Sequence, residues 1–419
     1  AKALGIQVIF QDLSLFPNLT VLENIAIDHE LGGALKAPPR RAMRETALAA
    51  LARLDAHLPL GAPVGSLSVA QRQIVAICRG LAANARLLFM DEPTASLTRH
   101  EVDLLLATVR RLKSQGVAIV FVSHRLEEVV EIAERVTVLR DGRKVGTFPA
   151  SEIDDHRLAE LMTGRRIEHA VRARRTAAGA PVLELRNAGR AGEFEDVSLA
   201  LHSGEIVGLT GLLGAGRTEL ALALFGMTPL ERGELLLDGR PVRLRSNRDA
   251  VACGIAYVSE DRLSLGLNLR QSIADNVSIT VLDQLSDRAG LVSPVDRREM
   301  AQDWVGRLDI RAASIDAAVQ TLSGGNQQRV VLAKWLATKP KVLILDSPTV
   351  GVDIRNKQGI YDVIRQLADR GVAILLISDE VPEVYFNADR VLHMRDGRIV
   401  GAFVPGEVGE HDLAQAIYA

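Results

Sequence analysis

An internal repeat constrains the fold of this 419-residue chain more than any other feature of its sequence. Four short motifs recur at a spacing of 255 residues: 67–68 with 322–323, 91–94 with 346–349, 122–124 with 377–379, and 140–143 with 395–398. A fifth pair, 5–12 with 254–261, has a spacing of 249 residues. A constant spacing across several motifs indicates that one structural unit occurs twice.

The two copies do not begin at equivalent points. The second copy opens near Val182 and has a glycine-rich loop from Gly211, but subtracting 249 places both counterparts before residue 1. We therefore expect a first copy without its opening strands and loop, in a chain that is either truncated at its N-terminus or a natural short form. The predicted boundaries are 1–165 for the first copy, 166–181 for an Arg- and Ala-rich linker, and 182–419 for the second copy.

Composition excludes several classes of protein. The net charge of -2 argues against a dedicated nucleic-acid binder. The two cysteines lie far apart and imply no disulfide framework, which fits a reducing compartment. Apolar runs such as 117–122 and 342–345 have the length of strands, well short of the roughly 18 residues of a spanning helix. We expect a cytosolic chain, or one that reaches a membrane only through a partner.

The pattern of apolar residues indicates strands that alternate with helices. Residues 85–90 and 117–122 are apolar on both faces, which predicts buried strands. Thr20 is a plausible N-cap for a helix over 20–28. The segment 67–83 is predicted to be helical after Ser68. Such alternation predicts an α/β fold with a mostly parallel sheet and helices on its faces.

The glycine-rich loop of the second copy has the context that phosphate binding requires. It lies between a predicted strand, 205–210, and a predicted helix, 219–225. Glycines let backbone N–H groups approach phosphate, and Thr218 could reach Mg²⁺. Position 217 is Arg where such loops have Lys, so we expect nucleotide binding without efficient hydrolysis here; a turn without a ligand is the alternative. The candidate nucleotide-binding residues are Gly211, Gly214, Ala215, Gly216, Arg217, Thr218 and Glu219.

Acidic residues follow an apolar strand in the first copy. Asp91 would hold Mg²⁺ through water, and Glu92 would polarise the attacking water. His124, at the end of the next strand, could contact the γ-phosphate, and Gln11 could sense Mg²⁺ and the γ-phosphate from its loop. Each side chain alone could be structural, but their order and their repeated partners favour a hydrolytic site.

The second copy lacks most of this chemistry. Ser347 replaces Glu92, Asp379 replaces His124 and Glu260 replaces Gln11, although Asp346 can still serve Mg²⁺. The serine turn that precedes the apolar strand in each copy shows the opposite difference, because here the second copy keeps the phosphate-binding pattern. The second copy reads Leu-Ser-Gly-Gly-Asn-Gln-Gln over 322–328, and its glycines leave backbone N–H groups open to an anion. The first copy reads Ser68-Val69-Ala70-Gln71, and it has Thr98 in place of Asp353.

The order of these motifs resembles that of ATP-binding cassette proteins. The tandem form resembles the fused twin-cassette ATPases of monosaccharide importers, of the ribose, xylose, galactose and autoinducer-2 type. Three details are typical of that group: the sequence Gly-Ala-Gly-Arg-Thr-Glu at 214–219, the turn at 322–328, and a residue other than His at position 379. Two features depart from it, namely Ser347, where the family mostly keeps Glu, and the absent first glycine-rich loop.

The resemblance implies two P-loop NTPase cassettes, each with a RecA-like, mostly parallel sheet, an antiparallel β part and a helical subdomain, the first being incomplete. It also implies head-to-tail packing, with each nucleotide between the loop of one cassette and the signature turn of the other. The hydrolytic site would then combine Gln11, Asp91, Glu92 and His124 with Ser323, Gly324, Gly325, Gln327 and Asp353. The other site would combine the 211–219 loop, Asp346 and Glu260 with Ser68 and Gln71, and it looks degenerate.

The resemblance further implies an ATP-binding subunit that energises monosaccharide import with ATP and Mg²⁺. Its partners would be transmembrane permease subunits and, indirectly, a periplasmic sugar-binding protein, with no nucleic acid. It would lie peripherally on the cytoplasmic face of the inner membrane. This chain alone is expected to be a weak or inactive hydrolase. A soluble twin-cassette ATPase unconnected with transport and a non-hydrolysing nucleotide-binding fragment are the alternatives. The residues do not identify the sugar.

Overall fold

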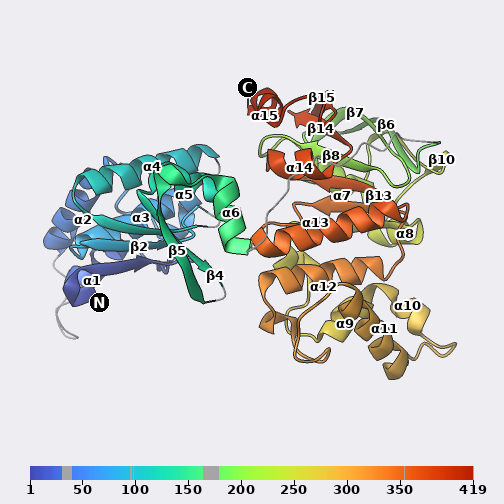
Figure 1. Cartoon of the computed structure of the whole chain (residues 1–419), viewed down its shortest axis with the longest axis horizontal. Coiled ribbons are helices and arrows are strands. Elements are labelled where there is room, and N and C mark those ends of the chain that lie inside the picture. Colours follow the sequence, from blue (N-terminus) through green and yellow to red (C-terminus); the bar gives the residue numbers. More distant parts are fainter. Residues whose placement is uncertain are drawn as a thin grey trace. The chain divides into compact units, whose positions relative to one another are not determined.

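The computed structural model describes residues 1–30, 40–94, 97, 99–123, 125–140, 142–163, 179–352 and 354–418. The chain divides into two compact units, Ala1–Ile167 and Glu168–Ala419 (Figure 1). Most of the predicted linker lies outside the described residues, which resume at residue 179. No helix in these described ranges is both long and apolar enough to cross a membrane.

The first unit is an α/β arrangement in which β1, β2 and β3 form a parallel sheet and β4 and β5 form a separate antiparallel pair. Its elements are β1 (Ile6–Ile9), α1 (Val21–Glu30), α2 (Arg40–Leu54), α3 (Val69–Ala82), β2 (Leu87–Asp91), α4 (Arg99–Ser114), β3 (Ala118–Val122), α5 (Leu126–Ile132), β4 (Arg135–Arg140), β5 (Arg143–Pro149) and α6 (Asp155–Thr163).

The second unit contains a six-stranded sheet in the order β11-β12-β13-β8-β14-β15 and an antiparallel sheet in the order β10-β9-β6-β7. Its strands are β6 (Leu183–Arg190), β7 (Phe194–Leu201), β8 (Ile206–Thr210), β9 (Arg232–Leu237), β10 (Arg240–Val242), β11 (Ile255–Val258), β12 (Val342–Asp346), β13 (Ala373–Ile377), β14 (Arg390–Arg395) and β15 (Arg398–Phe403). Its helices are α7 (Arg217–Leu224), α8 (Asn247–Ala252), α9 (Ile273–Ser278), α10 (Leu282–Leu285), α11 (Pro294–Arg307), α12 (Gly324–Leu336), α13 (Ile354–Asp369), α14 (Val381–Asn387) and α15 (Glu410–Tyr418).

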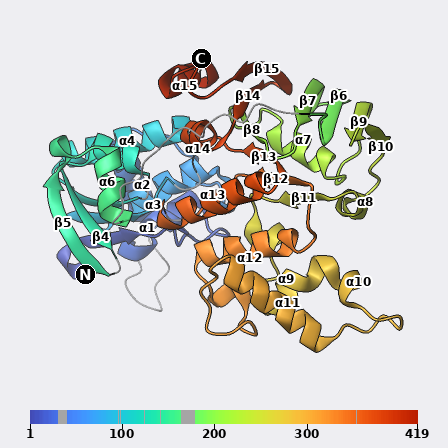
Figure 2. The same ribbon diagram turned by 45° about the vertical axis from the view of Figure 1, so that its right-hand side comes forward.

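Two apolar cores cover the two faces of the large sheet. One packs α12, α13 and α14 against it, and the other packs α7 and the antiparallel sheet against the opposite face. Helices α9, α11 and α12 gather into a helical lobe, visible in both views of the chain (Figures 1 and 2). The parallel sheet, the antiparallel sheet and the helical lobe are the three parts that the resemblance implies, so the predicted fold class is confirmed.

Strand register repeats between the units. Ile6 pairs with Leu87 as Ile255 pairs with Val342, and Leu87 pairs with Ala118 as Val342 pairs with Ala373. The units differ at β8, which joins β13 to β14 in the second unit. Among the described residues of the first unit no strand takes that place. Its sheet is therefore split into β1-β2-β3 and β4-β5.

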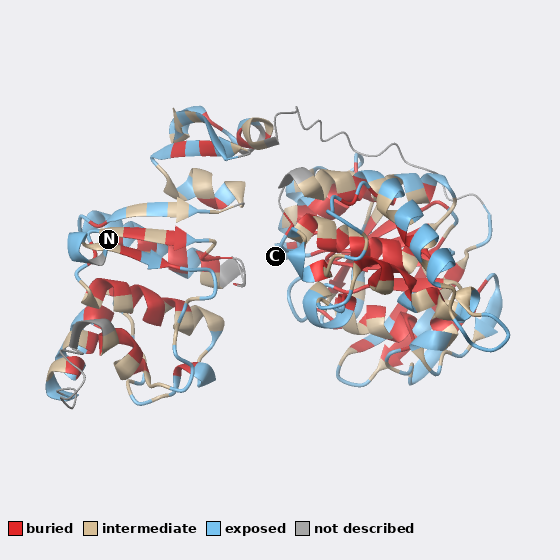
Figure 3. Ribbon diagram, turned by 90° about the horizontal axis from the view of Figure 1, so that it is seen from below, coloured by how far each residue is buried: buried red, intermediate tan, exposed pale blue. Residues whose placement is uncertain are grey.

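The prediction that both apolar strands of the first unit are buried on both faces is wrong. In β3, Val120 is 39% exposed and Val122 is 46% exposed, whereas their counterparts Leu375 and Ile377 are 0% and 1% exposed. Strand β2 is buried on one face only. The apolar pattern itself is the same in both units. The difference arises because the layer over 183–225 packs on this face in the second unit. Figure 3 shows the resulting contrast in burial between the units.

The predicted helix cap at Thr20 is confirmed, and Ser68, predicted only to stand before a helix, is a cap as well. The Thr20 hydroxyl accepts from the Glu23 N–H at 3.2 Å, and the Glu23 carboxylate accepts from the Thr20 N–H at 2.8 Å. Ser68 caps α3 in the same reciprocal way with Gln71. Such capping boxes satisfy N–H groups that a helix start would otherwise leave unpaired.

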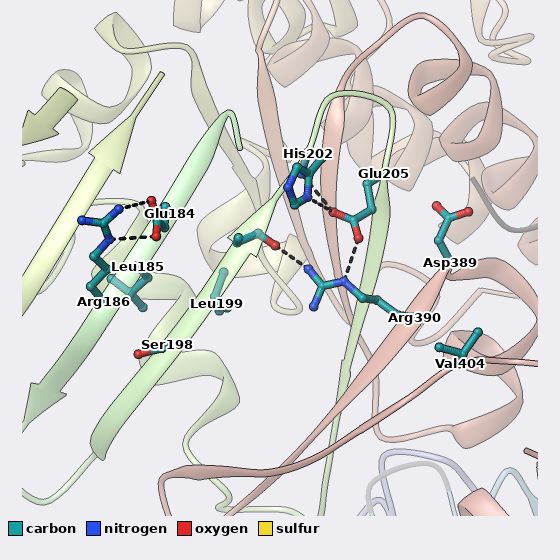
Figure 4. Close-up of a pocket in the computed structure, with 11 residues that line it drawn as sticks. Glu184, Leu185, Arg186, Ser198, Leu199, His202, Glu205, Asp389, Arg390 and Val404 are labelled. Carbon is teal, nitrogen blue, oxygen red and sulfur yellow. Dashed lines mark hydrogen bonds and ion pairs between the residues drawn. The ribbon is translucent and has the colours of Figure 1, made fainter. Parts of the chain in front are cut away.

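A polar clamp joins the amino ends of β8 and β14 in the second unit. The buried Glu205 carboxylate accepts from Arg390 Nε at 2.7 Å and from the backbone N–H of His202 at 3.0 Å (Figure 4). Arg390 also donates to the Ala200 carbonyl. Burial opposes the charged form of Glu205, but Arg390 and His202 nevertheless keep its pKa below the usual value. This cluster lines a cavity of about 520 Å³, at the end of β8 opposite the glycine-rich loop.

Replacing Arg390 with Met should destabilise the second unit by about 3 kcal/mol, because it leaves a buried carboxylate without its cation. At 2–4 °C per kcal/mol, the expected fall in Tm is about 6–12 °C. Both tryptophans, Trp304 and Trp335, belong to this unit, so their fluorescence follows its unfolding.

Arg398→Met is the matched control. Arg398 and its partner Glu195 are each 52% exposed, so the loss should stay within about 1 kcal/mol. The pKa of Glu205 is lowered from 4.5, so its stabilisation is present above pH 4.5 and is lost as the pH falls through the folded-state pKa. The gap between wild type and Arg390→Met should therefore narrow below about pH 4.5. Equal effects of the two substitutions would contradict the clamp.

Candidate functional site

The glycine-rich loop lies where the sequence predicts it, between β8 and α7. A Cβ at Gly211 would lie 2.1 Å from the Met394 carbonyl oxygen, and one at Gly216 would lie 2.6 Å from that of Glu193. Gly216 also has a φ of +94°, which glycine adopts readily. It is the N-cap of α7 and has no side chain to bond the first N–H groups of the helix. Those donors remain open to an anion.

Three side chains meet beneath this loop at the carboxyl ends of the strands. The Asp346 carboxylate accepts from the Tyr257 hydroxyl at 3.0 Å, and the nearby Thr218 hydroxyl acts to lower the pKa of Asp346. Asp346 is 1% exposed, and this burial raises its pKa. Arg217 is 9% exposed, and one of its terminal nitrogens is buried with no hydrogen-bond partner. Its charge acts on Asp346, favouring the ionised carboxylate.

Two further acids of the second unit border this cluster. Burial raises the pKa of Glu260, and the charges of Asp346 and Asp379 raise it further, while Arg217 opposes them. Several carboxyl groups thus converge on one guanidinium. A bound cation or extra hydrogen-bond donors would relieve their mutual repulsion.

The residues present fit a magnesium ion that is held jointly with phosphate. Mg²⁺ takes few protein ligands and keeps water and phosphate oxygens. Thr218 and Asp346 supply a hydroxyl and a carboxylate that lie close enough for the hydroxyl to lower the pKa of the carboxyl group. No group of three His, Cys, Asp or Glu side chains forms a dedicated metal cluster in the described part of the chain. When bound, Mg²⁺ would neutralise phosphate charge there.

In the first unit, the structure brings Gln11 and Glu92 together. The Gln11 amide donates to the Glu92 carboxylate at 3.3 Å. Glu92 has a φ of +45° and donates its N–H to the Val122 carbonyl at 2.8 Å. Ser347 repeats this backbone, with the same φ of +45° and a 2.9 Å bond to the Ile377 carbonyl. The two positions are therefore structurally equivalent and differ in side-chain chemistry.

Not every predicted residue can be placed. His124 and Asp353 lie outside the described residues. Asp91 is exposed at the end of β2, whereas its counterpart Asp346 is buried. The amide of Gln327 is used within its own unit, where it donates to the Leu322 carbonyl.

The two serine turns differ in their hydrogen bonding. In the first unit, the Ser68 hydroxyl accepts from the Gln71 N–H at 3.2 Å, and the Gln71 side chain accepts from the Ser68 N–H at 3.1 Å. The Ser323 side chain makes no such cap, and its oxygen accepts from the Asn326 amide at 2.9 Å. Asn is one methylene shorter than Gln, which accounts for the change in partner. Thus no side chain caps the start of α12, whereas the start of α3 is capped internally.

Sequence reasoning missed a buried carboxylate that is repeated in both units. Glu383 accepts from the hydroxyl groups of Thr349 and Ser378, which belong to the loops after β12 and β13. Glu128 accepts from Thr94 at 2.6 Å and Ser123 at 3.2 Å in the first unit. The 255-residue spacing holds for all three pairs and was the available signal. This network fixes the two loops that carry the candidate catalytic positions.

The compensating cation differs between the units. Lys357 donates to Glu383 at 2.9 Å and to Glu380 at 3.0 Å, while Arg125 lies 3.4 Å from Glu128 in the first unit. Arg125 and Glu380 occupy equivalent positions, so the charge at that position is inverted. Burial, followed by the charge of Glu383, raises the pKa of Glu380 to about 7.

Comparison with known proteins shows the family of this chain. The family model described as ABC transporter matches residues 2–95 and 194–350. The ribose import ATP-binding protein RbsA 2 of Rhizobium johnstonii is 42% identical over 412 residues, which are 98% of this chain and 80% of that protein. The ribose import ATP-binding protein RbsA 2 of Rubrobacter xylanophilus is 45% identical over 423 residues, 99% of this chain and 80% of that protein.

One solved structure is similar to part of this chain at lower identity. The nucleotide-free ATP-binding cassette from an ABC transporter has 20% sequence identity and a TM-score of 0.49. The match covers 57% of this chain and 99% of that one.

Proposed function

Because this chain belongs to the ABC transporter family, we propose that it is the ATP-binding subunit of a ribose-type monosaccharide importer. The observation that carries the proposal is the placement of Thr218 and Arg217 against Asp346, beneath an uncapped glycine-rich helix start. The likeness to proteins named for ribose import extends over 98% of the chain and supports a sugar as the cargo.

The proposed partners follow from this role. Transmembrane permease subunits would form the sugar path, and a periplasmic binding protein would deliver the sugar to them. The chain would then act at the cytoplasmic face of the inner membrane, held by the permease. We assign it no nucleic-acid partner, in keeping with its net charge of -2.

The two nucleotide sites are proposed to be unequal. In the hydrolytic site, Glu92 orients the attacking water, Gln11 and Asp91 attend to the metal and γ-phosphate, and His124 contacts the γ-phosphate. Ser323, Gly324 and Gly325 would complete it with open backbone donors, and Asp353 would reach it as well. In the other site, Ser347, Asp379 and Glu260 replace the hydrolytic residues, and Ser68 and Gln71 satisfy each other. That site would bind nucleotide and turn it over slowly or not at all.

The proposed cycle uses this inequality. ATP would stabilise a closed pair of cassettes, because its γ-phosphate contacts groups from both and so binds the closed state more tightly. Hydrolysis at the Glu92 site would remove that contact and release the pair. The 419-residue chain alone should be weakly active or inactive, since its first unit has no counterpart of the 211–218 loop.

Binding of MgATP to the second unit tests the basic proposal. MgATP should raise the Tm followed by Trp304 and Trp335 fluorescence, because a ligand that binds only the folded unit stabilises it. Thr218→Ala should weaken the apparent affinity for MgATP about tenfold, the effect expected on losing a hydroxyl group that serves the metal. Thr218→Ala should change the affinity for ATP measured without Mg²⁺ much less than the affinity for MgATP.

Thr228→Ala is the matched control, because Thr228 follows the opposite end of α7. It should leave both affinities unchanged. A Tm that does not respond to MgATP would count against nucleotide binding by this unit. Loss of ribose uptake on deletion of the gene would support a sugar as the cargo. Normal uptake of every pentose and hexose tested would oppose that assignment.

A further inference from the structure

Three loops of the second unit converge on the side chain of Arg262. Arg262 begins a π-helical turn, Arg262–Gly266, that follows the Glu260 loop. Its two terminal nitrogens donate to the carbonyl oxygens of Val350 at 2.5 Å and Gly351 at 3.1 Å. These acceptors lie 88 and 89 residues further along the chain, in the loop after β12. Asp261 fixes the start of the turn by accepting from the Leu263 and Ser264 N–H groups.

The guanidinium is also packed against the signature turn. A Cβ at Gly324 would lie 3.1 Å from an Arg262 nitrogen and 3.0 Å from the Gly351 carbonyl oxygen. A Cβ at Gly351 would lie 3.1 Å from the same Arg262 nitrogen. Both glycines therefore leave the space that this guanidinium occupies. The Nε of Arg262 is buried without a partner, so the side chain is held by its two terminal donors.

Arg262 adjoins the phosphate site of its own unit through the backbone. Its N–H donates to the Glu260 carbonyl at 3.0 Å. The Glu260 carboxyl group is in turn influenced by Arg217, Asp346 and Asp379, the groups around the glycine-rich loop. Residues 260–262 thus connect the groups around the glycine-rich loop to the turn at 323–325 and the loop at 350–351.

The described part of the first unit has no equivalent of this arrangement. The 249-residue spacing pairs Arg262 with Leu13, which cannot donate to a carbonyl from its side chain. Leu13 also has a φ of +60°, so the backbone follows a different path. The connection belongs to the unit whose signature turn is left uncapped.

We propose that Arg262 is a positioning residue that holds the signature turn and the 350–351 loop in one arrangement and passes nucleotide occupancy of its own unit to them. The proposal rests on the proposed function, because the signature turn and Asp353, which follows the 350–351 loop, are assigned there to the hydrolytic site. Arg262 is not among the residues assigned above to either nucleotide site. The planar fork of Arg donates to two carbonyls at once, which a Lys ammonium on a flexible stem does not reproduce.

The first test is amide hydrogen exchange of the intact chain without nucleotide. The N–H groups of Val350 and Val352 bond to Ser347 and Thr349, so a peptide over 346–356 reports on the loop. Arg262→Gln should speed exchange there about tenfold, since two charge-assisted hydrogen bonds are lost. Arg262→Lys should give a smaller increase. Arg270→Gln, at an exposed position further along the same segment, should have no effect.

The second test measures coupling, using MgATP as the probe. In wild type, MgATP binding should slow exchange over 322–327 and 346–356. In Arg262→Gln it should no longer do so, although the Trp-fluorescence affinity for MgATP stays within about twofold of wild type. A purely structural role predicts that affinity and Tm fall together. Unchanged exchange in Arg262→Gln, or full MgATP protection in it, would overturn the proposal.

The third test separates this inference from the proposed function. In the protein as expressed from its gene and reconstituted with permease, Arg262→Gln should lower kcat about tenfold with KM for ATP nearly unchanged. If kcat is unaffected while the exchange results hold, the connection exists but the hydrolytic site is not built on this signature turn. If exchange fails while Glu92→Gln still abolishes turnover, the proposed function stands and the role of Arg262 is wrong.

Discussion

Replacing Glu92 with Gln should lower ATP turnover by about 100-fold or more, the usual range for loss of a general base. Gln keeps the size of the side chain and can still bond Gln11, but it cannot accept a proton from water. Glu92 follows β2 with a backbone φ of +45°, and its N–H donates to the Val122 carbonyl. The fold should therefore survive. The measurement is steady-state ATP hydrolysis by the protein as expressed from its gene, together with its permease.

Ser347→Ala provides the matched control. Ser347 has the same backbone conformation at the equivalent position of the second unit, so the two substitutions probe equivalent places. Turnover should stay within about twofold, because a neutral hydroxyl is not a base at physiological pH. ATP binding measured by filter retention should persist in both variants. Retained turnover in Glu92→Gln, or loss of it in Ser347→Ala, would remove Glu92 from its assigned role.

Local structure was largely predictable because its causes are local. The caps at Thr20 and Ser68 depend on residues three positions apart, and the loop 211–216 depends on glycines between a strand and a helix. With the 255-residue spacing, each strand predicted in one unit also predicts the equivalent strand in the other unit. These elements are confirmed to within a few residues.

Burial was less predictable because it depends on distant neighbours. Val122 and Ile377 occupy equivalent positions in equally apolar strands, yet one is 46% exposed and the other 1%. The decisive factor is the layer formed by 183–225, which no property of the strand itself reveals. The contacts of Arg262 and Glu383 escaped sequence reasoning for the same reason, since their partners are as many as 89 residues away.

Opposite effects of one substitution at the two serine turns would test the inequality of the sites most directly. Ser323→Arg should lower turnover about 100-fold or more, because a long side chain would cover backbone donors that stabilise developing charge. Ser323 is exposed and caps nothing, so the stability of the second unit should change little. Ser68→Arg should leave turnover within about threefold. It should instead cost about 1 kcal/mol at the start of α3, because it removes a helix cap.

Two measurements resolve this pair of variants. ATP hydrolysis by the reconstituted protein reports on the two sites, and amide exchange at Gln71 and its neighbours in α3 reports on the helix cap. The physical basis of the contrast is the third residue of each helix. Gln71 reaches back to the Ser68 N–H and closes the turn, whereas Asn326 bonds the Ser323 oxygen and leaves the N–H groups uncovered. If Ser68→Arg were the variant that stops turnover, the open turn would be the inactive one and the assignment of the two sites would be reversed.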